Sequence, residues 1–139
     1  MSEKRVRSPA GFAASGSLTG KVREYDRVMT ELVPRVKTPA DWEPLVRFVA
    51  VDDFERVGTF REVQDWAAYT EMLTGWATAI DSFGTTVRRI SELPNLVYYQ
   101  IEEQHQRDGN LSVVNTLTVF EFDDEGLIRR LDVFLQQRR

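Results

Sequence analysis

The last third of the chain constrains the fold most strongly, because it consists of four runs rich in Val, Thr, Tyr and Phe. The runs cover residues 85–92, 96–106, 112–122 and 127–136, and short breaks of Pro, Asn, Asp and Gly separate them. Long β-prone runs with breaks of this kind are typical of antiparallel strands joined by hairpins. The sequence therefore predicts a sheet of long strands at the C-terminal end of the chain.

The residues before this sheet predict helices that cover one of its faces. Apolar side chains recur at spacings of three and four over residues 21–36 and 63–80, which is the pattern of an amphipathic helix. A further helix should open at Thr38 as its N-cap, and a short strand should follow over residues 54–59. The sequence therefore predicts the α+β class, with an N-terminal helical layer on a mainly antiparallel sheet.

The length of 139 residues and the ordinary mixture of apolar and charged residues predict a single globular domain over residues 21–139. Residues 1–20 are rich in Ser, Gly and basic side chains, and we interpret them as a flexible tail. A partner-binding arm is the alternative for this segment, because its basic residues give it a local positive charge.

Composition excludes several functional classes. The chain has no cysteine and a single histidine, His105, which argues against disulfides and against a metal site of Cys or His ligands. The net charge of -4 argues against nucleic-acid binding, and there is no phosphate-binding glycine loop. No apolar run reaches the roughly 20 residues of a membrane span, and the first residues lack the apolar segment of a secretory signal. We expect a cytoplasmic protein with no metal, no cofactor, and neither nucleic acid nor membrane as a partner.

Both faces of the last two predicted strands carry apolar residues. In the run over residues 112–122, Phe120 and Phe122 share one face, while Leu117 and Val119 share the other. A sheet covered by helices on one side and by water on the other needs only one apolar face. The second face therefore predicts contact with another copy of the chain, that is, a homodimer through the sheet.

Two segments, Asp52–Gly58 and Val119–Phe134, are similar to sequence segments of a known superfamily. Together with the order of helix, helix, short strand, long helix and antiparallel meander, they make residues 21–136 resemble the nuclear transport factor 2-like superfamily. Its members include ketosteroid isomerases, limonene epoxide hydrolases, SnoaL-type polyketide cyclases, scytalone dehydratases and transport adaptors. The resemblance implies helices on the concave face of a strongly curved, cone-shaped sheet, an apolar conical pocket between them, and a dimer through the convex face.

The Asp-Arg-Asp trio of limonene epoxide hydrolases is matched in part. Glu103 stands at the position of the first acid and Asp132 at that of the second, but the bridging arginine falls on Ile101, which cannot orient two carboxylates. The two carboxylates alone still suit a general acid/base pair if one is protonated. Strand alternation points Asp132 to solvent, because Leu131 and Val133 lie on the more apolar face. The resemblance instead points Asp132 into the pocket, and we adopt that orientation as the expectation.

The ketosteroid isomerase pattern is matched by two residues. Asp53 lies near the position of the base, and Tyr25 lies on the first helix, where a hydroxyl donor to an oxyanion belongs. A second donor has no clear counterpart, and Asn115 and Thr118 are only guesses for it. The structural alternatives are a turn at Asp53 and a core position for Tyr25.

The predicted function is binding of a small, largely apolar organic molecule in the conical pocket. Acid/base catalysis of the isomerase, cyclase, dehydratase or hydrolase type would extend that function. The catalytic candidates are Asp132, Glu103, Asp53 and Tyr25, and the substrate-binding candidates are Tyr99, Ile101, His105, Trp76, Phe120 and Phe134. The rival hypothesis is a non-catalytic dimerisation or adaptor module whose pocket is filled by the chain's own aromatic side chains.

Overall fold

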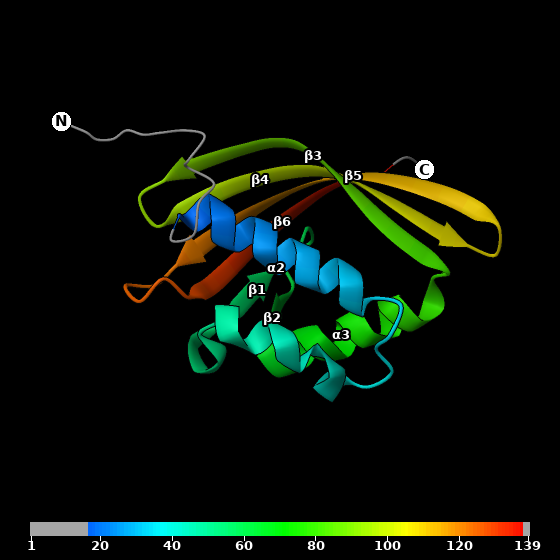
Figure 1. Ribbon diagram of the computed structural model, residues 1–139, viewed down its shortest axis with the longest axis horizontal. Helices are drawn as coiled ribbons and strands as arrows, with labels where there is room; N and C mark the ends of the chain where they lie inside the picture. Colours follow the sequence, from blue (N-terminus) through cyan, green and yellow to red (C-terminus); the bar gives the residue numbers. More distant parts are fainter. Residues whose placement is uncertain (1–16, 138–139) are drawn as a thin grey trace.

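The computed structural model of the chain describes residues 17–137. In order, the elements are α2 (Leu18–Leu32), η2 (Pro39–Phe48), η3 (Val51–Asp53), β1 (Glu55–Val57), β2 (Val63–Gln64), α3 (Trp66–Ala79), β3 (Ser82–Leu93), β4 (Leu96–Arg107), β5 (Asn110–Phe122) and β6 (Ile128–Gln137), where η marks a 3-10 helix. Figure 1 shows β3 to β6 as a curved sheet with α2 and α3 on one of its sides. The predicted α+β class is confirmed.

The strands form one mixed sheet in the order β2-β1-β6-β5-β4-β3. The long strands β3 to β6 pair antiparallel with their neighbours in sequence, as the four predicted runs require, and their ends lie within a few residues of the predicted ones. The short strand β1 differs, because it lies parallel to β6 with Arg56 beside Leu131. This pairing joins the middle of the chain to its last strand.

Helix α2 begins earlier than its apolar pattern predicted. The Ser17 side chain accepts a hydrogen bond of 2.8 Å from the backbone N–H of Gly20, which caps the helix so that Leu18 is its first residue. Residues 18–20, which we expected in the tail, therefore belong to the helix. The rest of the predicted tail, residues 1–16, lies outside the described residues. The helix ends at Leu32, shortly before Pro34.

The second helical segment, η2, opens at Thr38 as predicted. The Asp41 carboxylate accepts hydrogen bonds from the backbone N–H groups of Lys37 at 2.8 Å and Thr38 at 3.0 Å. These bonds hold the pKa of Asp41 below its usual range. The segment forms a 3-10 helix with Pro44 inside it, and a proline has no N–H for the hydrogen-bond ladder of a regular α-helix.

Helix α3 begins at Trp66, three residues later than the predicted start at Val63. The Asp65 side chain caps it by accepting a hydrogen bond of 2.8 Å from the backbone N–H of Ala68. Residues Val63–Gln64 instead form β2 and pair with β1 at the edge of the sheet. Among residues 17–137, no helix is long and apolar enough to cross a membrane.

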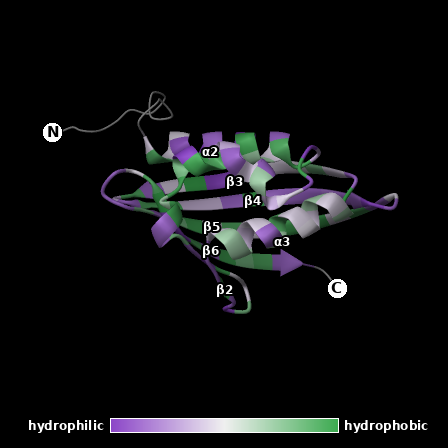
Figure 2. Cartoon of the chain, turned by 90° about the horizontal axis from the view of Figure 1, so that it is seen from below, coloured by the Kyte–Doolittle hydropathy of each residue, from purple (hydrophilic) through white to green (hydrophobic). Residues whose placement is uncertain are grey.

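The core lies where the three helical segments meet the sheet. Hydrophobic residues alternate with hydrophilic ones along α2 (Figure 2), and its Val22 is fully buried. Trp42 of η2 is also fully buried, and its indole N–H donates a hydrogen bond of 3.0 Å to the Thr74 hydroxyl of α3. This bond joins η2 to α3 and helps to hold α3 in place over the sheet.

Replacing Gly75 by alanine is expected to raise the free energy of unfolding by about 0.5–1 kcal/mol. Gly75 lies inside α3, and an added Cβ would meet nothing within 4 Å. The matched change is Gly109→Ala, where a Cβ again meets nothing but φ is +80°. That change should destabilise the protein by about 1 kcal/mol, because the left-handed region disfavours alanine. Urea unfolding measures the free energy of unfolding of both variants. Stabilisation by Gly109→Ala as well as by Gly75→Ala would contradict the argument from backbone conformation.

Candidate functional site

A cavity of about 650 Å³ lies between the concave face of the sheet and the helices α2 and α3. The long strands line it with alternate residues, which from β5 are Asn110, Ser112, Val114, Thr116, Thr118 and Phe120. The end near Ser112 and Gln137 is open, since these lining residues are exposed. The end near Phe120 and Leu131 is closed, because both are buried. The lining is mostly aromatic and aliphatic, with a few polar groups along its length.

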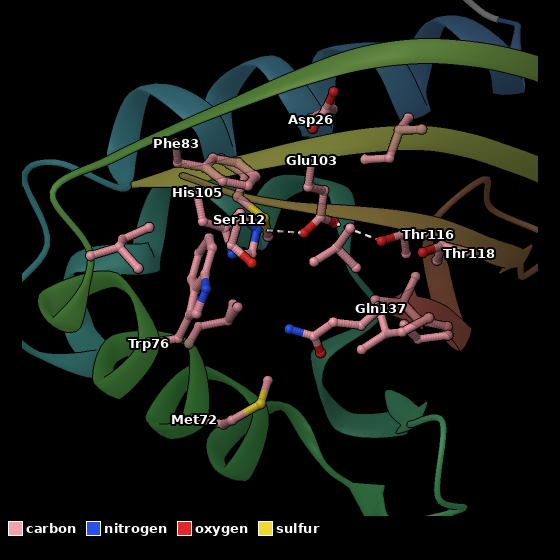
Figure 3. Close-up of a pocket in the computed structure, with 18 of the residues that line it drawn as sticks. Asp26, Met72, Trp76, Phe83, Glu103, His105, Ser112, Thr116, Thr118 and Gln137 are labelled. Atoms are coloured by element: carbon pink, nitrogen blue, oxygen red, sulfur yellow. Dashed lines mark hydrogen bonds and ion pairs between the residues drawn. The ribbon is translucent and has the colours of Figure 1, made fainter. Parts of the chain in front are cut away.

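Glu103 and His105 of β4 form a hydrogen-bonded pair inside this cavity (Figure 3). The Nε2 atom of His105 lies 2.9 Å from Oε1 of Glu103, and the Thr116 hydroxyl donates to Oε2 of Glu103 at 3.2 Å. The two side chains of the pair are only 20% and 18% exposed. Because they are two residues apart on one strand, alternation points both to the concave face. A carboxylate in contact with an imidazole is an arrangement that can accept and return a proton.

Aromatic rings enclose the imidazole of His105. The Trp76 ring of α3 lies 5.5 Å from it and the Phe83 ring of β3 lies 5.4 Å from it, measured between ring centroids. Trp76 and Phe83 also contact each other edge to face at 4.9 Å. These contacts fix the ring orientation of His105 and keep the pair partly shielded from water.

A second carboxyl in the cavity comes from α2. The Tyr99 hydroxyl donates a hydrogen bond of 2.5 Å to Asp26, and the Thr85 hydroxyl donates one of 3.3 Å. Burial raises the pKa of Asp26, although the hydrogen bonds from Tyr99 and Thr85 lower it in part and the negative charge of Glu103 raises it again. Burial and the Asp26 carboxyl also raise the pKa of Tyr99. Asp26 is therefore an acid that holds its proton to a higher pH than usual.

The closed end of the cavity holds Tyr25, Arg56 and Tyr69. Their exposed fractions are 3%, 9% and 6%. Burial, followed by the neighbouring Tyr69, raises the pKa of Tyr25 well above its usual range, whereas the positive charge of Arg56 lowers it in part. Burial likewise raises the pKa of Tyr69, which Arg56 also lowers in part. The Arg56 guanidinium lies 5.4 Å from the centroid of the Tyr69 ring.

Most of the candidates from the sequence lie at this cavity. Of the catalytic candidates, Tyr25 and Glu103 line it. Five of the substrate-binding candidates also line it, and these are Tyr99, Ile101, His105, Trp76 and Phe120. The structure thus brings together residues from α2, α3, β4 and β5, while three further candidates lie elsewhere.

Asp132 lies on the convex face, away from the cavity, which corrects the orientation that we adopted from the resemblance. Its neighbours Leu131 and Val133 line the cavity, so alternation turns Asp132 outward. There it forms an ion pair of 3.1 Å with Arg130, which also pairs with Glu55 at 2.6 Å. The leucine-rich face of β6 packs inward because burying it contributes more than burying one carboxylate.

Asp53 and Phe134 also lie outside the cavity. Asp53 is exposed at the end of η3, where its backbone N–H donates to the carbonyl of Ala50 at 3.0 Å, as the turn alternative predicted. Phe134 shares the convex face with Asp132 and is 55% exposed. Of the two guesses for a second donor, Thr118 lines the cavity, whereas Asn115 is exposed and has the opposite strand parity.

Sequence reasoning missed Asp26, Arg56 and Tyr69. Asp26 follows Tyr25 at the border of the apolar stripe of α2, and a helix pattern does not fix on which side such a border residue lies. Arg56 had only a weak signal, because it has the same strand parity as the apolar Phe54 but lies in a strand of only three residues. Among residues 17–137 there is no group of three or more His, Asp or Glu side chains placed to hold a metal ion.

Asp26 should make the stability of the protein depend on pH. Because the folded state raises the pKa of Asp26 above its ordinary 3.8, the folded state binds this proton more tightly than the unfolded chain. The free energy of unfolding should therefore fall as pH rises from 3.8 through the raised pKa. Asp26→Asn should remove this decline, and Tyr99→Phe should extend it to higher pH by removing a bond that lowers the pKa. Urea titrations across acidic and neutral pH test this, and an unchanged profile in Asp26→Asn would contradict it.

No family model matches the chain, and no curated protein matches it in sequence. Solved structures do share its fold. A protein from Shewanella putrefaciens CN-32, assigned as a SnoaL-like polyketide cyclase, has a TM-score of 0.69 at 11% identity, over 85% of this chain and 88% of that one. An NTF2-like protein of unknown function from Exiguobacterium sp. 255-15 has a TM-score of 0.68 at 12% identity, over 85% and 99%.

A third similar structure is that of SalBIII, described as an epoxide hydrolase/cyclase-like enzyme in pyran ring formation in the polyether salinomycin. Its TM-score is 0.66 at 20% identity, over 86% of this chain and 90% of that one. At these identities the similarity shows the fold, and it confirms the fold that the resemblance implied.

Proposed function

We propose that this chain, which has the nuclear transport factor 2-like fold, binds a small and largely apolar organic molecule and transfers protons on it. The Glu103–His105 pair carries the proposal. It is a hydrogen-bonded acid and imidazole, 2.9 Å apart, in a cavity of about 650 Å³ whose lining is otherwise mostly apolar. Pockets for small molecules commonly combine an apolar lining with a few convergent polar groups.

The geometry of the pair suggests how a proton moves. An ionised Glu103 accepts the Nε2–H of His105, which leaves Nδ1 of the imidazole as the proton acceptor. The hydrogen bond from Thr116 and the contacts with Trp76 and Phe83 keep the carboxylate and the ring in place. A bound molecule with an acidic C–H or O–H would lose its proton to the pair and later regain one from it.

Asp26 supplies the complementary acid. It keeps its proton to a higher pH than an ordinary aspartate because it is buried, and it lines the same cavity as Glu103. Two ionisable groups with different environments in one site suit paired acid and base roles. Such a pair serves isomerisation, cyclisation, dehydration or hydrolysis, and two of the similar structures carry cyclase-type assignments.

A thermal-shift screen of steroids, terpenoid epoxides and aromatic polyketides tests ligand binding. A compound that binds in the cavity should raise the melting temperature of the wild type. The shift should vanish in Ser112→Trp, which fills the open end, and persist in Thr78→Trp, which places the same ring at an exposed position of α3 outside the cavity. No stabilisation by any class, or equal shifts in both variants, would count against the proposal. The volume of the cavity favours this function over a module with a filled pocket.

We also propose that the chain forms a homodimer through the convex face of the sheet. Tyr98, Val113 and Phe134 are 38%, 44% and 55% exposed there, and Phe134 lies beside Leu117 in the strand register. Burying such a patch against a second copy removes it from water. Light scattering at micromolar concentration should give twice the chain mass, and Phe134→Glu should give a monomer. Phe60→Glu, at an exposed turn between β1 and β2, is the control, and a monomeric wild type would contradict the proposal.

The remaining parts of the proposal concern partners and location. The net charge of -4 supports a small organic molecule, and not nucleic acid, as the ligand. We propose the cytoplasm as the place of action, which cell fractionation tests directly. Recovery of the protein with the membrane or nucleoid fraction would contradict this part.

A further inference from the structure

The closed end of the cavity holds two buried groups that can donate a hydrogen bond to a ligand. The Arg56 guanidinium donates to the Gln64 side-chain oxygen at 2.9 Å, and its one ion pair within residues 17–137 is a long one of 3.8 Å to the half-exposed Glu62. The Tyr25 hydroxyl is fully buried and makes no hydrogen bond of good geometry to any residue that the structure describes, although the neighbouring Tyr69 raises its pKa. A buried guanidinium with only a long ion pair and a buried hydroxyl without a good partner both cost free energy.

The acidic groups of the enclosed cavity do not supply the missing acceptor. Asp26 already accepts hydrogen bonds from Tyr99 and Thr85. Glu103 already accepts one from Thr116 and pairs with His105. The positive charge of Arg56 is therefore balanced only in part by protein groups, and an anionic group that enters the cavity can balance the rest.

We infer that Arg56 and Tyr25, with Tyr69 beside them, form a subsite for a negatively charged oxygen of the ligand. This inference rests on the proposed function, because it names the chemical class of the molecule that the cavity binds. The oxygen belongs to a carboxylate of the ligand, for which a guanidinium and a phenol hydroxyl are suitable donors.

The location of the subsite supports the assignment. Arg56 lies beside Leu131 in β1–β6 pairing, and Leu131 lies beside Phe120 of β5. The aromatic ring of Tyr25 contacts that of Phe120 at 5.9 Å. His105, by contrast, lies beside Ser112 near the open end. A ligand with its anionic oxygen at the closed end would place its apolar body along the middle of the cavity and its other end near Glu103 and His105.

Two probes with the same ring system test the subsite: 2-naphthoate and its methyl ester. The wild type should bind 2-naphthoate about 10- to 100-fold more tightly than the ester. Arg56→Met should abolish this preference, and Arg56→Lys should keep part of it. Equal affinities for the two probes, or a preference that is unchanged in Arg56→Met, would overturn the inference.

Tyr25→Phe gives a second test that does not depend on a charged substitution. Removing an unpartnered buried hydroxyl should leave the melting temperature of the free protein unchanged or higher, while the affinity for the preferred probe falls about 3- to 10-fold. Thr78→Val, which removes an exposed hydroxyl of α3 outside the cavity, is the control and should change neither quantity. A lower melting temperature with unchanged affinity would show that the Tyr25 hydroxyl is structural and would overturn its role.

The proposed function can fail separately from this inference. If probe binding depends on Arg56 but no screened compound is turned over, the proposal of acid/base catalysis is wrong and the subsite is still supported. If the thermal shifts of the screened compounds vanish in Ser112→Trp but not in Arg56→Met, ligand binding in the cavity is supported and the subsite is wrong.

Discussion

Glu103→Gln is expected to lower the turnover number for a cavity-bound substrate by about 10²- to 10⁴-fold, the range that general acid/base groups contribute. The glutamine keeps the shape of the side chain but loses the charge that orients His105 through the 2.9 Å contact. A neutral amide neither stabilises the imidazolium that forms after proton removal nor holds a defined tautomer. Binding should change far less than turnover, because the apolar lining is intact. Steady-state kinetics on a compound found by thermal shift measure both quantities.

The matched control is Glu102→Gln, one residue away on the same strand. Alternation places Glu102 on the opposite face, where it pairs with Arg88 at 2.7 Å. This change should leave the turnover number within about a factor of two of the wild type, since exposed ion pairs contribute little. Equal losses in the two variants would show that any lost carboxylate on β4 disturbs the protein, and the proposed acid/base role of Glu103 would then be wrong.

Trp42→Ala is expected to lower the free energy of unfolding by about 3–5 kcal/mol, as large-to-small substitutions of fully buried aromatic residues do. Trp42 is fully buried, and its loss removes a large apolar side chain and leaves a void between η2 and α3. The substitution also removes the hydrogen bond from the indole N–H to the hydroxyl of Thr74. Urea unfolding followed by circular dichroism measures the change.

Trp42→Phe separates packing from hydrogen bonding. It keeps most of the apolar volume but not the indole N–H, and should cost about 1–2 kcal/mol. If Trp42→Ala costs no more than Trp42→Phe, the segment η2 does not rely on the packing described above. Because α3 carries Trp76, a loosened η2 should also weaken ligand binding in the alanine variant.

The long sheet was predictable because its signals are local and repeated. Each of the four runs combines β-prone residues with turn residues at both ends, so pairing and approximate boundaries follow from sequence alone. Tyr99, Ile101, Glu103 and His105 of β4 have the same strand parity, and the structure places all four at the cavity. These strand and turn signals, together with the predicted helices, were enough to predict the fold class.

The orientation of Asp132 shows which of two arguments to follow when they disagree. Alternation placed it with solvent, and the resemblance placed it in the pocket. A shift of one residue in β6 would turn Leu131 and Val133 out of the core, so the apolar pattern determines the register. At identities of 11–20% to the similar structures, the position of one polar residue does not transfer with the fold.

Other parts of the site could not be found from the sequence. A single arginine in a three-residue strand has too short a pattern to distinguish a buried position from an exposed one. The contact between Asp26 and Tyr99 joins residues 73 positions apart, and no local pattern predicts such a contact. The cavity itself depends on how side chains from α2, α3 and five strands pack, which is a property of the assembled fold.

The parallel pairing of β1 with β6 has a consequence for how the protein is made. The hairpins from β3 to β6 connect neighbours in sequence and can form early. Glu55 of β1 and Arg130 of β6, by contrast, pair although they are far apart in the sequence. Closing so long a loop is entropically costly and must wait until the last strand has been synthesised. During translation Arg56 therefore has no finished cavity to line until β6 has emerged from the ribosome, so the cavity is complete only after β6 has been made.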